Sequence, residues 1–416
     1  MQRTLYFAFF AVVFISSHFL VSITPRGEFE ILLISVFFAF AGWVAVLREN
    51  LSLWKLILLS LVVRAVFYWN LPMLSDDFYR FIWDGSHILD GVNPIGKIPL
   101  NTTAEVANAQ LLLDNMNSPN YPSVYPPLHQ LGMTFGALFS GLNSQVNGMR
   151  VFILVFEALG FWYFFRKAPQ HLKWYLLYLI NPLVIIEGTG NVHFEAALLP
   201  LVAIAVDQIG KKQIFATALS MAGAVLVKLN PLMLVPAFWT EVKSLKLVFI
   251  NGLIVFLGFL PFLSGFIESL DGIDLFFRSF EFNASIYYLV SEIGESILGY
   301  NPISIVGPVL ALTSLTLILL ISFGKDNLND KILFIYLIFL LFSSTVHPWY
   351  IIPVVYFSLS TGRQAIAIWS FTAFFSYTHY LGELEPKYPW LIAEYGLLLA
   401  AVIYEWRKRP LQLFLG

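Results

Sequence analysis

The sequence predicts an all-α, polytopic membrane protein, for reasons given by its composition and its hydropathy pattern. Of the 416 residues, 58% are hydrophobic and only 12% are charged, whereas an average soluble domain carries roughly 25% charged residues. Aromatic residues make up 17% of the chain, as expected where rings pack between helices and line both membrane interfaces. Most of the chain must therefore face lipid or other helices rather than water.

Apolar stretches of about 20 residues cross a hydrocarbon core of about 30 Å, and such stretches recur along the whole chain. The uninterrupted ones occupy residues 4–23, 29–47, 51–70, 148–165, 247–266 and 302–323. Shorter runs, broken by proline or glycine, occupy residues 174–188, 194–209, 213–229, 231–240, 332–346, 349–360, 363–381 and 391–406. We expect about 12–14 membrane helices in one integral membrane domain, residues 1–416. Broken helices persist in lipid only where protein or a water-filled cavity satisfies their backbone, so the second half should enclose a cavity.

The distribution of lysine and arginine predicts the orientation, because these residues stay in cytoplasmic loops. If residues 126–141 do not cross, both termini lie inside, together with the basic residues Arg3, Arg48, Lys55, Arg166, Lys167, Lys173, Lys211, Lys212, Lys243, Lys246, Lys325, Lys331, Arg363, Arg407, Lys408 and Arg409. The loops predicted on the outer side of the membrane are then residues 71–147, 188–193, 267–301, 347 and 382–389. The first apolar stretch lacks a small-residue cleavage pattern, so we expect a retained helix rather than a signal peptide.

Residues 71–147 form a large outer loop, and loops of this length are usually functional or disordered. The segment is rich in Trp, Tyr, Phe, Gly and Pro, which favours an ordered structure. Within it, residues 76–89 have helical spacing, and Gly91 and Pro94 end that helix. We therefore expect a structured loop with helices along the outer membrane interface.

Charge and motif content exclude several functional classes. A formal net charge of -2 argues against a nucleic-acid partner, which requires a concentrated basic face. The absence of cysteine excludes disulfides, thiolate nucleophiles and cysteine-based zinc sites. Neither a P-loop nor a Rossmann glycine fingerprint is present, so the sequence indicates no nucleotide site of either kind.

The strongest chemical motif is Ser75-Asp76-Asp77-Phe78-Tyr79-Arg80-Phe81-Ile82-Trp83-Asp84-Gly85. Two adjacent carboxylates beside a membrane helix repel each other, and partial desolvation raises the pKa of one of them toward that of a general base. Asp76 and Asp77 are therefore the candidate catalytic residues. Arg80 is placed to hold one carboxylate ionised or to bind an anionic headgroup. The structural alternative is a capped interfacial helix, with Asp76 near its N-terminus.

A second polar segment, on the same side of the membrane, is Glu187-Gly188-Thr189-Gly190-Asn191-Val192-His193-Phe194-Glu195. Four hydrogen-bonding side chains on a glycine-rich turn suit a sugar or a hydrated metal ion, and an ordinary polar turn is the alternative. Ionisable residues near the midplane are rare and usually functional, so Glu157, Glu187 and Lys228 indicate a cavity. For Lys228 the alternative is a side chain that reaches the interface.

A third motif, Thr345-Val346-His347-Pro348-Trp349-Tyr350, places an imidazole and two aromatic rings at a proline-bent outer corner. His347 is suited to a phosphate, and the rings are suited to stacking on a hexose. The alternative is a corner of the aromatic belt. The segment from Tyr121 to Pro127 predicts a rigid extended strut, which by itself carries no chemistry.

Taken together, these motifs resemble the GT-C superfamily of integral membrane glycosyltransferases, most closely the bacterial polyprenol-phosphate-mannose-dependent α-mannosyltransferases. The acidic motif, followed by Gly91-x-Asn93-Pro94, is similar to the first outer-loop signature of that family. Later landmarks occur in the same order, at Tyr125-Pro126-Pro127-Leu128, Asn181-Pro182-Leu183 through Gly190-Asn191-x-His193, Lys228-x-Asn230-Pro231 and His347-Pro348-Trp349-Tyr350. The resemblance covers about residues 60–355. One position departs from it, because Glu195 stands where an Asn-Asp pair is expected after His193.

The resemblance implies a GT-C type bundle in the cell inner (cytoplasmic) membrane, with the active site facing outward. It implies transfer of a hexose, expected to be mannose, from a polyprenyl-phosphate-linked donor to an acceptor hydroxyl of a glycan or glycolipid. Asp76 or Asp77 would deprotonate the acceptor, and a single displacement would invert the configuration. Arg80, Lys228 or His347 would neutralise the leaving phosphate. Further substrate-binding residues are expected at Asp84, Tyr125, Glu187, Asn191, His193, Glu195, Trp349 and Tyr350.

The sequence indicates no certain cofactor, and a divalent cation on the acidic groups stays open because no ligand set has a strong spacing. Two other functions also stay open: a secondary transporter with a midplane polar cavity, and a lipid-linked-oligosaccharide ligase. The chain shows no pair of matching halves, which argues against the transporter.

Three geometric expectations follow. The side chains of Asp76, Asp77, Glu187, His193 and His347 should converge on one outward-opening cavity, and a hydrophobic groove should lead from it into the outer leaflet. Asp76 should share a helical face with Arg80 and Asp84 and form an ion pair with Arg80. The resemblance slightly favours Asp76 as the base, whereas Asp77 is the freer of the two because it lacks a basic partner at i+4.

Overall fold

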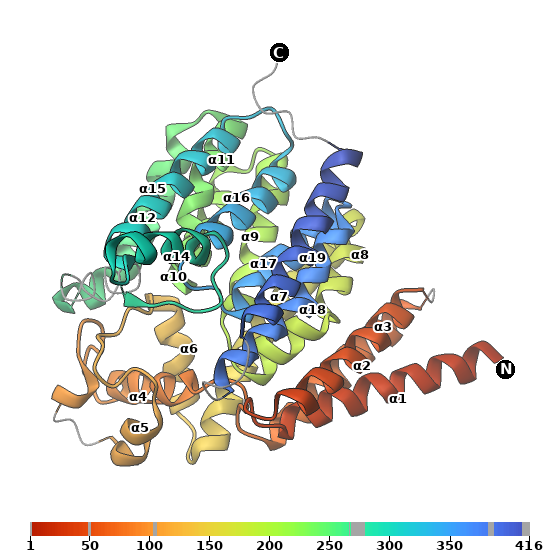
Figure 1. Cartoon of the computed structure of the whole chain (residues 1–416), viewed down its shortest axis with the longest axis horizontal. Helices are drawn as coiled ribbons and strands as arrows, with labels where there is room; N and C mark the ends of the chain where they lie inside the picture. The colour runs from red at the N-terminus through yellow and green to blue at the C-terminus, as the bar shows by residue number, and fades with distance from the viewer. Residues whose placement is uncertain are drawn as a thin grey trace.

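The computed structural model describes residues 2–48, 51–102, 106–265, 267, 279–381 and 387–409. Across these ranges the regular elements are all helical, and the only β-type pairings are two isolated bridges, Ile95 with Ser123 and Phe282 with Thr345. The predicted all-α fold class is confirmed. The helices pack into one elongated bundle, with the N-terminal helices leaning away from the rest (Figure 1).

The N-terminal region is a hairpin of two long helices followed by a shorter helical segment. Its elements are α1 (Gln2–Ile23), α2 (Phe29–Arg48), α3 (Leu53–Ala65) and the 3-10 helix η1 (Val66–Trp69). The expected single helix over residues 51–70 is therefore divided in two. A buried ion pair joins α3 to the next long helix, because Arg64 donates to both carboxylate oxygens of Glu157 at 3.0 and 2.8 Å. Glu157 thus has a buried partner that joins two helices.

In the segment 71–147, predicted to be an outer loop, the described residues before Leu142 form a compact layer of short helices at one end of the bundle (Figure 1). Its elements are α4 (Asp77–Leu89), η2 (Pro99–Asn101), α5 (Ala109–Asn115) and α6 (Pro127–Ala137). α6 has 11 residues, about 16 Å of helix, which is too short to cross a bilayer. The segment ends earlier than expected, because the next long helix begins at Leu142.

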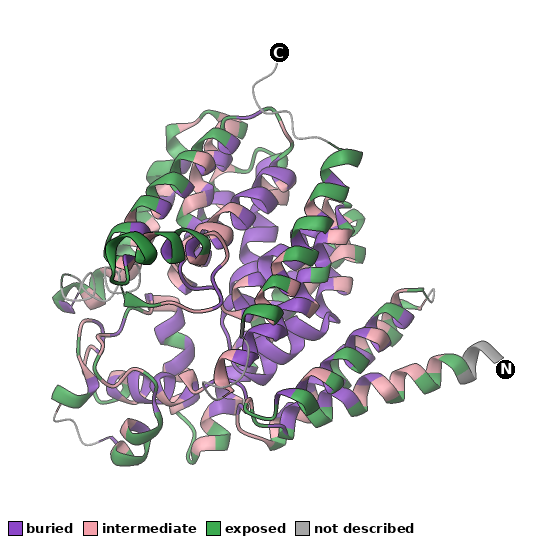
Figure 2. Cartoon of the chain, viewed as in Figure 1, coloured by how far each residue is buried: buried purple, intermediate pink, exposed green. Residues whose placement is uncertain are grey.

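The centre of the bundle holds the most deeply buried helix. The elements here are α7 (Leu142–Lys167), α8 (Pro169–Leu179), the π-helix η3 (Val184–Gly190), α9 (Glu195–Gly210) and α10 (Ile214–Val227). Residues 195–205 of α9 are all buried, and Figure 2 shows this buried colour concentrated in the middle of the molecule. The axes of η3 and α9 differ by 116°, so the chain turns sharply at residues 191–194.

The second half consists largely of short helices, as the proline and glycine interruptions predict. Its elements are η4 (Asn230–Leu234), α11 (Val235–Val242), α12 (Leu245–Phe259), η5 (Leu260–Gly265), α14 (Ile286–Leu298), α15 (Ile303–Ser322), α16 (Leu328–Phe342), η6 (Pro348–Ile351), α17 (Ile352–Ser360), η7 (Gln364–Ile368), α18 (Trp369–Thr372), η8 (Ala373–Tyr380) and α19 (Lys387–Lys408).

Length and hydropathy identify the helices that can cross a bilayer unaided. Within the described ranges five pass this test: α1 from Tyr6, α2, α7, α12 continued by η5, and α15. The bent pair of η3 and α9 would make a sixth. The chain is thus a multi-pass membrane protein. The count of about 12–14 crossings stays a prediction, because the other expected spans are divided into helices too short to be assigned by length.

Candidate active site

The acidic motif lies where the outer segment begins, and its two aspartates have different backbone environments. α4 begins at Asp77, whereas Asp76 is the residue before the helix, with φ -94° and ψ 1°. Asp76 therefore does not share the helical face of Arg80. The expected ion pair between these two residues is absent, and this prediction is wrong.

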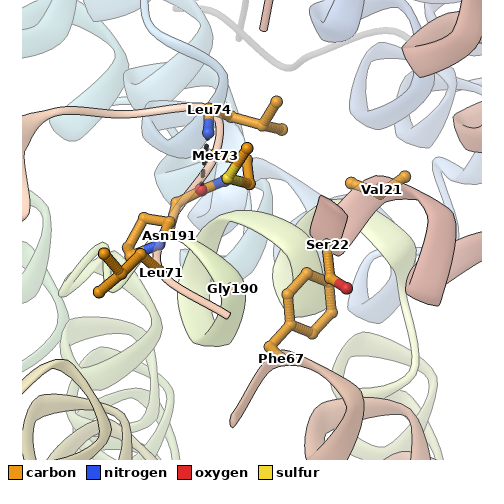
Figure 3. A pocket seen from close by; sticks show the side chains of 9 residues that line it. Val21, Ser22, Phe67, Leu71, Met73, Leu74, Gly190 and Asn191 are labelled. Atoms are coloured by element: carbon orange, nitrogen blue, oxygen red, sulfur yellow. Dashed lines mark hydrogen bonds between the residues drawn. The ribbon is translucent and has the colours of Figure 1, made fainter. Parts of the chain in front are cut away.

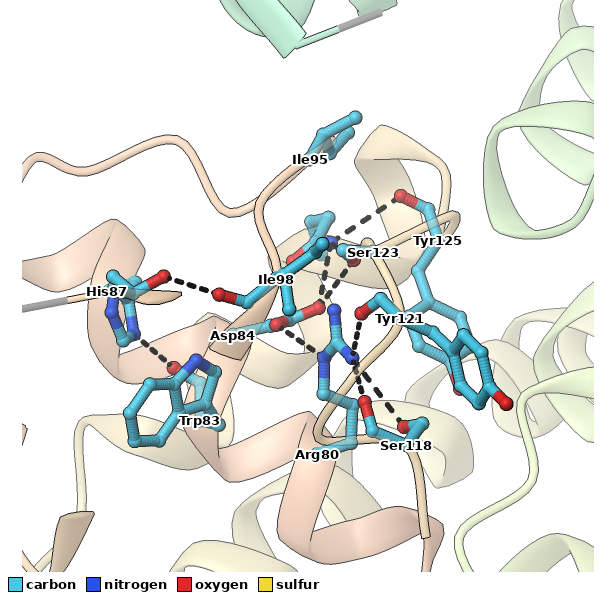
Figure 4. A network of polar contacts seen from close by, with 12 residues as sticks. Arg80, Trp83, Asp84, His87, Ile95, Ile98, Ser118, Tyr121, Ser123 and Tyr125 are labelled. Carbon is cyan, nitrogen blue, oxygen red and sulfur yellow. Dashed lines mark hydrogen bonds and ion pairs between the residues drawn. The ribbon is translucent and has the colours of Figure 1, made fainter. Parts of the chain in front are cut away.

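Arg80 instead forms an ion pair with Asp84 one turn later, Nε to Oδ1 at 2.8 Å. Arg80 also donates to the backbone carbonyls of Ser118 and Tyr121 at 3.1 and 3.0 Å, and Asp84 accepts a hydrogen bond from Ser123. Figure 4 shows this network joining α4 to the extended strut. Arg80 and Asp84 are 2% and 1% exposed. The structure therefore gives both side chains internal partners, while one guanidinium nitrogen of Arg80 has no hydrogen-bond partner within the described residues; their expected substrate contacts stay a prediction.

Asp76 is paired with Arg26, which lies in the turn between α1 and α2. The Arg26 guanidinium carbon also lies 4.2 Å from the ring centroid of Tyr380, in η8. Both charged side chains remain partly accessible, at 30% for Arg26 and 34% for Asp76. Three segments far apart in the sequence thus meet at Asp76.

Asp77 has a neutral partner and keeps one carboxylate oxygen free. Its Oδ1 accepts a hydrogen bond of 2.7 Å from the Asn117 amide, while Oδ2 accepts none within the described part of the chain. Burial raises the pKa of Asp77, and the negative charge of Asp76 acts in the same direction. The Asn117 hydrogen bond and the nearby charge of Lys228 lower it only in part. A partly desolvated carboxylate with a free oxygen has the properties of a general base.

Lys228 is the cation nearest to this carboxylate among those that act on it. It ends α10 in an extended conformation and forms an ion pair with Glu195, at the start of α9. Its Nζ lies 4.1 Å from the centroid of the Tyr350 ring. The Lys228 side chain is 29% exposed whereas that of Glu195 is 3% exposed, so the carboxylate anchors an ammonium group that remains accessible.

The turn between η3 and α9 carries a second buried carboxylate. Glu187 accepts hydrogen bonds from the Tyr377 hydroxyl at 2.7 Å and the Asn191 amide at 3.2 Å. Its Oε2 lies 3.7 Å from Nε2 of His193. Asn191 also accepts a hydrogen bond of 3.3 Å from the backbone N–H of Leu74, two residues before Asp76. This turn therefore holds the acid-bearing segment in place.

Figure 3 shows how closely these segments approach one another. Ser22, Phe67, residues 71–74 and Asn191 surround a cavity of only about 10 Å³, which has room for about one water molecule. The backbone leading to Asp76 is thus packed against the η3 turn, with little freedom to move.

Aromatic rings form a column beside the carboxylates. The rings of Phe282 and His347 are stacked with centroids 4.4 Å apart, those of His347 and Trp349 are 4.3 Å apart, and those of Trp349 and His193 are 3.6 Å apart. Within the described residues, Nδ1 of His347 and Nε2 of His193 are buried without a hydrogen-bond partner. Burial lowers the pKa of His347 to about 3. His347 is therefore neutral near pH 7, so it can offer a phosphate a hydrogen bond but not the positive charge expected of it.

Tyr125 completes the site from the strut that precedes α6. Its ring packs edge-on against Phe81, with centroids 5.3 Å apart, and against His129 at 4.7 Å. Burial raises the pKa of Tyr125 well above its ordinary value, and the charge of Asp77 adds to this effect. The phenol therefore stays protonated and can act only as a neutral hydrogen-bonding group.

A further arginine holds the two halves of the site together. Arg150, in α7, donates to the backbone carbonyls of Phe67 and Asn70 at one side and of Thr189 and Gly190 at the other. It is 1% exposed, and within the described ranges it forms no ion pair with a carboxylate. Arg150 thus ties the segment before the acidic motif to the η3 turn.

The structure therefore brings together most of the residues singled out from the sequence. Leu74, two residues before Asp76 in the chain, bonds to Asn191. From Asn191, direct contacts continue to Glu187, His193, Trp349 and His347. Lys228, Glu195 and Tyr350 form the adjoining unit. Arg80 and Asp84 are buried and do not belong to this group of contacts. In the described residues no group of three or more His, Asp and Glu side chains is arranged to hold a metal ion, and we assign no step to a cation.

Sequence reasoning missed Arg26, Asn117, Arg150, Phe282, Tyr377 and Tyr380. For Arg26 a signal was available, because it lies in the short turn after the first predicted helix, on the side that the other basic loops avoid. The remaining residues give no such signal, since polar and aromatic side chains are common throughout the chain.

The fold and this site define a class of protein: a multi-pass membrane protein with a cluster of carboxylates, a lysine and stacked rings at one end of its bundle. Comparison with protein families makes this class specific. The sequence matches the MptA/B family, described as alpha-(1->6)-mannopyranosyltransferase, N-terminal domain, over residues 17–243. This match covers more than half of the chain, so the chain belongs to that family and is a mannosyl-transferring glycosyltransferase. No curated protein matches the chain.

Proposed function

We propose that this protein transfers a mannosyl residue from a polyprenyl-phosphate-linked donor to an acceptor hydroxyl at the outer face of the cell inner membrane. The observation that carries this proposal is an Asp77 carboxylate with a free oxygen and an accessible Lys228 whose charge acts on it; an apolar cleft that suits a lipid tail supports it. Family membership supports the mannosyl group. It also argues against the secondary transporter that the sequence alone left open.

The reaction is a single displacement at the anomeric carbon. Asp77 accepts the proton of the acceptor hydroxyl, and the acceptor oxygen forms a bond to C1 of the sugar. The bond between C1 and the phosphate oxygen breaks on the opposite side, and polyprenyl phosphate leaves with the electron pair. No protein nucleophile is needed. If the product has the α-(1→6) linkage that the family description gives, inversion requires a β-linked donor.

Lys228 is the group that stabilises the leaving phosphate in this proposal. Negative charge develops on the phosphate oxygen in the transition state, and a fixed cation in a site with little water lowers the energy of that state. Of the three groups expected to fill this role, Arg80 is already ion-paired with Asp84 and burial lowers the pKa of His347 to about 3, so Lys228 is the cation best placed for it. The neutral imidazoles of His193 and His347 remain available as hydrogen-bonding groups beside Trp349.

An apolar cleft of about 190 Å³ supports the lipid-linked donor. It is lined by residues of α15 and α16, including Ala311 and Phe339, and by Met233 of η4. Met233 follows Lys228 by five positions, and the cleft residue Ser344 precedes His347 by three. The cleft residues Met233 and Ser344 are thus close in sequence to Lys228 and His347, and the cleft is lined by two apolar helices, which supports the expected lateral groove for a polyprenyl tail.

The outer-face assignment follows from the distribution of charge. Asp77 begins α4, and α4 and α5 lie at one end of the bundle (Figure 1). Most lysine and arginine residues of the short loops are predicted at the opposite end, which is the cytoplasmic end by the positive-inside rule.

The test uses the purified full-length protein in detergent, with synthetic polyprenyl-phosphate mannose of each anomeric configuration and a short mannoside acceptor. We expect transfer from the β-linked donor only, with an α-linked product identified by NMR. Transfer from nucleotide-linked mannose instead would contradict the lipid-linked donor. Transfer of a preassembled oligosaccharide from a lipid pyrophosphate, with none from the monosaccharide donor, would support the ligase alternative.

A further inference from the structure

The turn between α1 and α2 reaches the candidate site from a part of the chain outside every motif recognised in the sequence. The backbone N–H of Arg26 donates to the carbonyl of Met73 at 3.2 Å, three residues before Asp76. The Arg26 side chain is fixed by Asp76 on one side and by the Tyr380 ring on the other. Arg26 is therefore held in place by one contact of its backbone and two contacts of its guanidinium group.

These contacts make the two adjacent aspartates chemically unequal. Asp76 has a charged partner, Arg26, and lies outside the helix. Asp77 has a neutral partner, Asn117, and a free Oδ2 within the described residues. An ion pair stabilises the ionised form of a carboxylate and weakens its ability to take a proton. A single hydrogen bond from a neutral group stabilises the ionised form much less.

We infer that Arg26 is a positioning residue that keeps Asp76 as an ion-paired carboxylate and thereby leaves Asp77 as the group that accepts the acceptor's proton. This inference rests on the proposed function. It extends the site to the N-terminal hairpin, so the α1–α2 turn becomes part of the machinery that sets the charge of the acidic pair.

The physical reason is the short distance along the chain between the two carboxylates. The charge of Asp76 raises the pKa of Asp77, and Arg26 offsets that charge. Other groups also act on Asp77 from the elements packed around it, namely Lys228, Glu195, Glu187, Tyr125, Tyr350 and Tyr380. Tyr380 also interacts with Arg26 and Asp76, and it is unchanged in every variant, so comparison of the single variants with the double variant isolates the contribution of the Arg26–Asp76 pair.

The test compares the pH dependence of kcat/KM for the full-length protein and for R26Q, R26K, D76N and the double variant R26Q/D76N. In the pH profile of kcat/KM, the acidic limb is the range in which activity falls as the pH decreases. In R26Q the unpaired Asp76 charge should move this limb to higher pH by on the order of one unit. In D76N the unpaired Arg26 charge should move the limb downward. The double variant and R26K should have limbs close to that of the wild type. R48Q is the matched control, because Arg48 is an exposed arginine at the other end of the same hairpin.

Two results would overturn the inference. One is a uniform loss of rate in R26Q with an unmoved limb, which is what a purely structural role predicts. The other is a D76N variant as inactive as D77N, because Asp76 would then be the base.

A second measurement separates this inference from the proposed function. Thermal unfolding of the wild type, R26Q, D76N and R26Q/D76N forms a double-mutant cycle, and an ion pair predicts that the two single shifts in Tm do not add. If the wild type transfers no sugar, the proposed function fails whatever the cycle shows. If the wild type is active but the Tm shifts are additive, the inference alone is overturned.

Discussion

At the scale of single residues, the site depends on the contrast between two neighbouring carboxylates. We predict that Asp77→Asn lowers kcat by about 10² or more, the usual scale for loss of a general base, because the amide cannot take the acceptor's proton. The measurement is initial-rate transfer from the lipid-linked donor, with Tm as a check of folding. Asp114→Asn is the matched control, since Asp114 is an exposed aspartate of the same outer segment and its loss should leave kcat unchanged.

The same residue predicts the pH dependence of the wild type. Asp77 must be ionised to accept a proton, and burial raises its pKa above the ordinary value of about 3.9. Activity should therefore be present at neutral pH and fall as the pH decreases through this raised pKa. In D77N the residual rate should not follow this limb. An unchanged limb in D77N would assign it to another group.

The leaving phosphate gives the second prediction at this scale. Lys228→Gln removes the cation proposed to stabilise that group and should lower kcat by on the order of 10²-fold, comparable with the loss of one transition-state donor. Lys228→Arg keeps the charge and should retain part of the rate. Lys211→Gln is the control, because it breaks a similar lysine–carboxylate pair, with Asp207, outside the site. Equal losses in K228Q and K211Q would indicate a general effect on folding.

The sequence predicted many of these residues but not their partners. Adjacent carboxylates, a histidine-bearing turn and a Pro-Trp-Tyr corner are visible as motifs because their residue types are rare in apolar segments. The pairing of Asp76 with Arg26 rather than Arg80 was not predictable, since it depends on where α4 begins. The helix was expected to begin at Asp76 but begins at Asp77. Asp76 therefore lies outside the helical face that it was expected to share with Arg80.

At the scale of elements, helix existence was predicted better than helix continuity. The long apolar stretches at residues 4–23, 29–47 and 302–323 became α1, α2 and α15 with nearly the expected bounds. The bend between η3 and α9 was not visible, because hydropathy does not report the angle between consecutive helices. That bend places Glu187 and His193 at the site, and Arg150 holds it by bonding to carbonyls that a straight helix would use internally.

The contact between α4 and α6 gives a prediction at the element scale. A Cβ added to Gly85 would lie 2.4 Å from the backbone oxygen of Met133, and a backbone atom cannot move aside as a side chain can. Gly85→Ala should therefore push α4 away from α6 and cost roughly 1–3 kcal/mol, the range for overpacking. Gly252→Ala in α12 is the control, because a Cβ there meets nothing within 4 Å.

We expect a lower Tm and a lower transfer rate for G85A, and for G252A a Tm equal to or above that of the wild type, since alanine favours a helix over glycine. A G85A variant with wild-type Tm would show that the two helices are not held at this separation.

At the scale of the whole molecule, the chain builds its site from segments that lie far apart in the sequence. The hairpin turn at Arg26, the acidic motif, the η3 turn, the end of α10 and the corner at His347 all meet at one end of the bundle. The match to the mannosyltransferase family covers residues 17–243. It therefore contains every one of these segments except the corner at His347. The corner at His347 lies beyond that range, and its contact with His193 through Trp349 joins it to the same site.

The apolar cleft gives the prediction that tests the architecture as a whole, because it concerns donor recognition away from the reacting atoms. Ala311→Phe adds a ring to a residue that lines the cleft and should displace part of a bound polyprenyl tail. Since each buried CH₂ contributes about 0.8 kcal/mol, loss of a few such groups should raise KM for a long-chain donor by on the order of tenfold. The KM for a donor with a single short isoprenoid should change little, because such a tail does not extend into the blocked region.

Leu312→Phe is the matched control, since Leu312 is the next residue of α15 but is 66% exposed and lies outside the cleft lining. Its KM for both donors should equal that of the wild type. If A311F and L312F behave alike with the long-chain donor, the cleft between α15 and α16 is not where the tail binds. Such a result would leave the roles of Asp77 and Lys228 intact, because the reaction at the anomeric carbon does not depend on the path that the lipid takes.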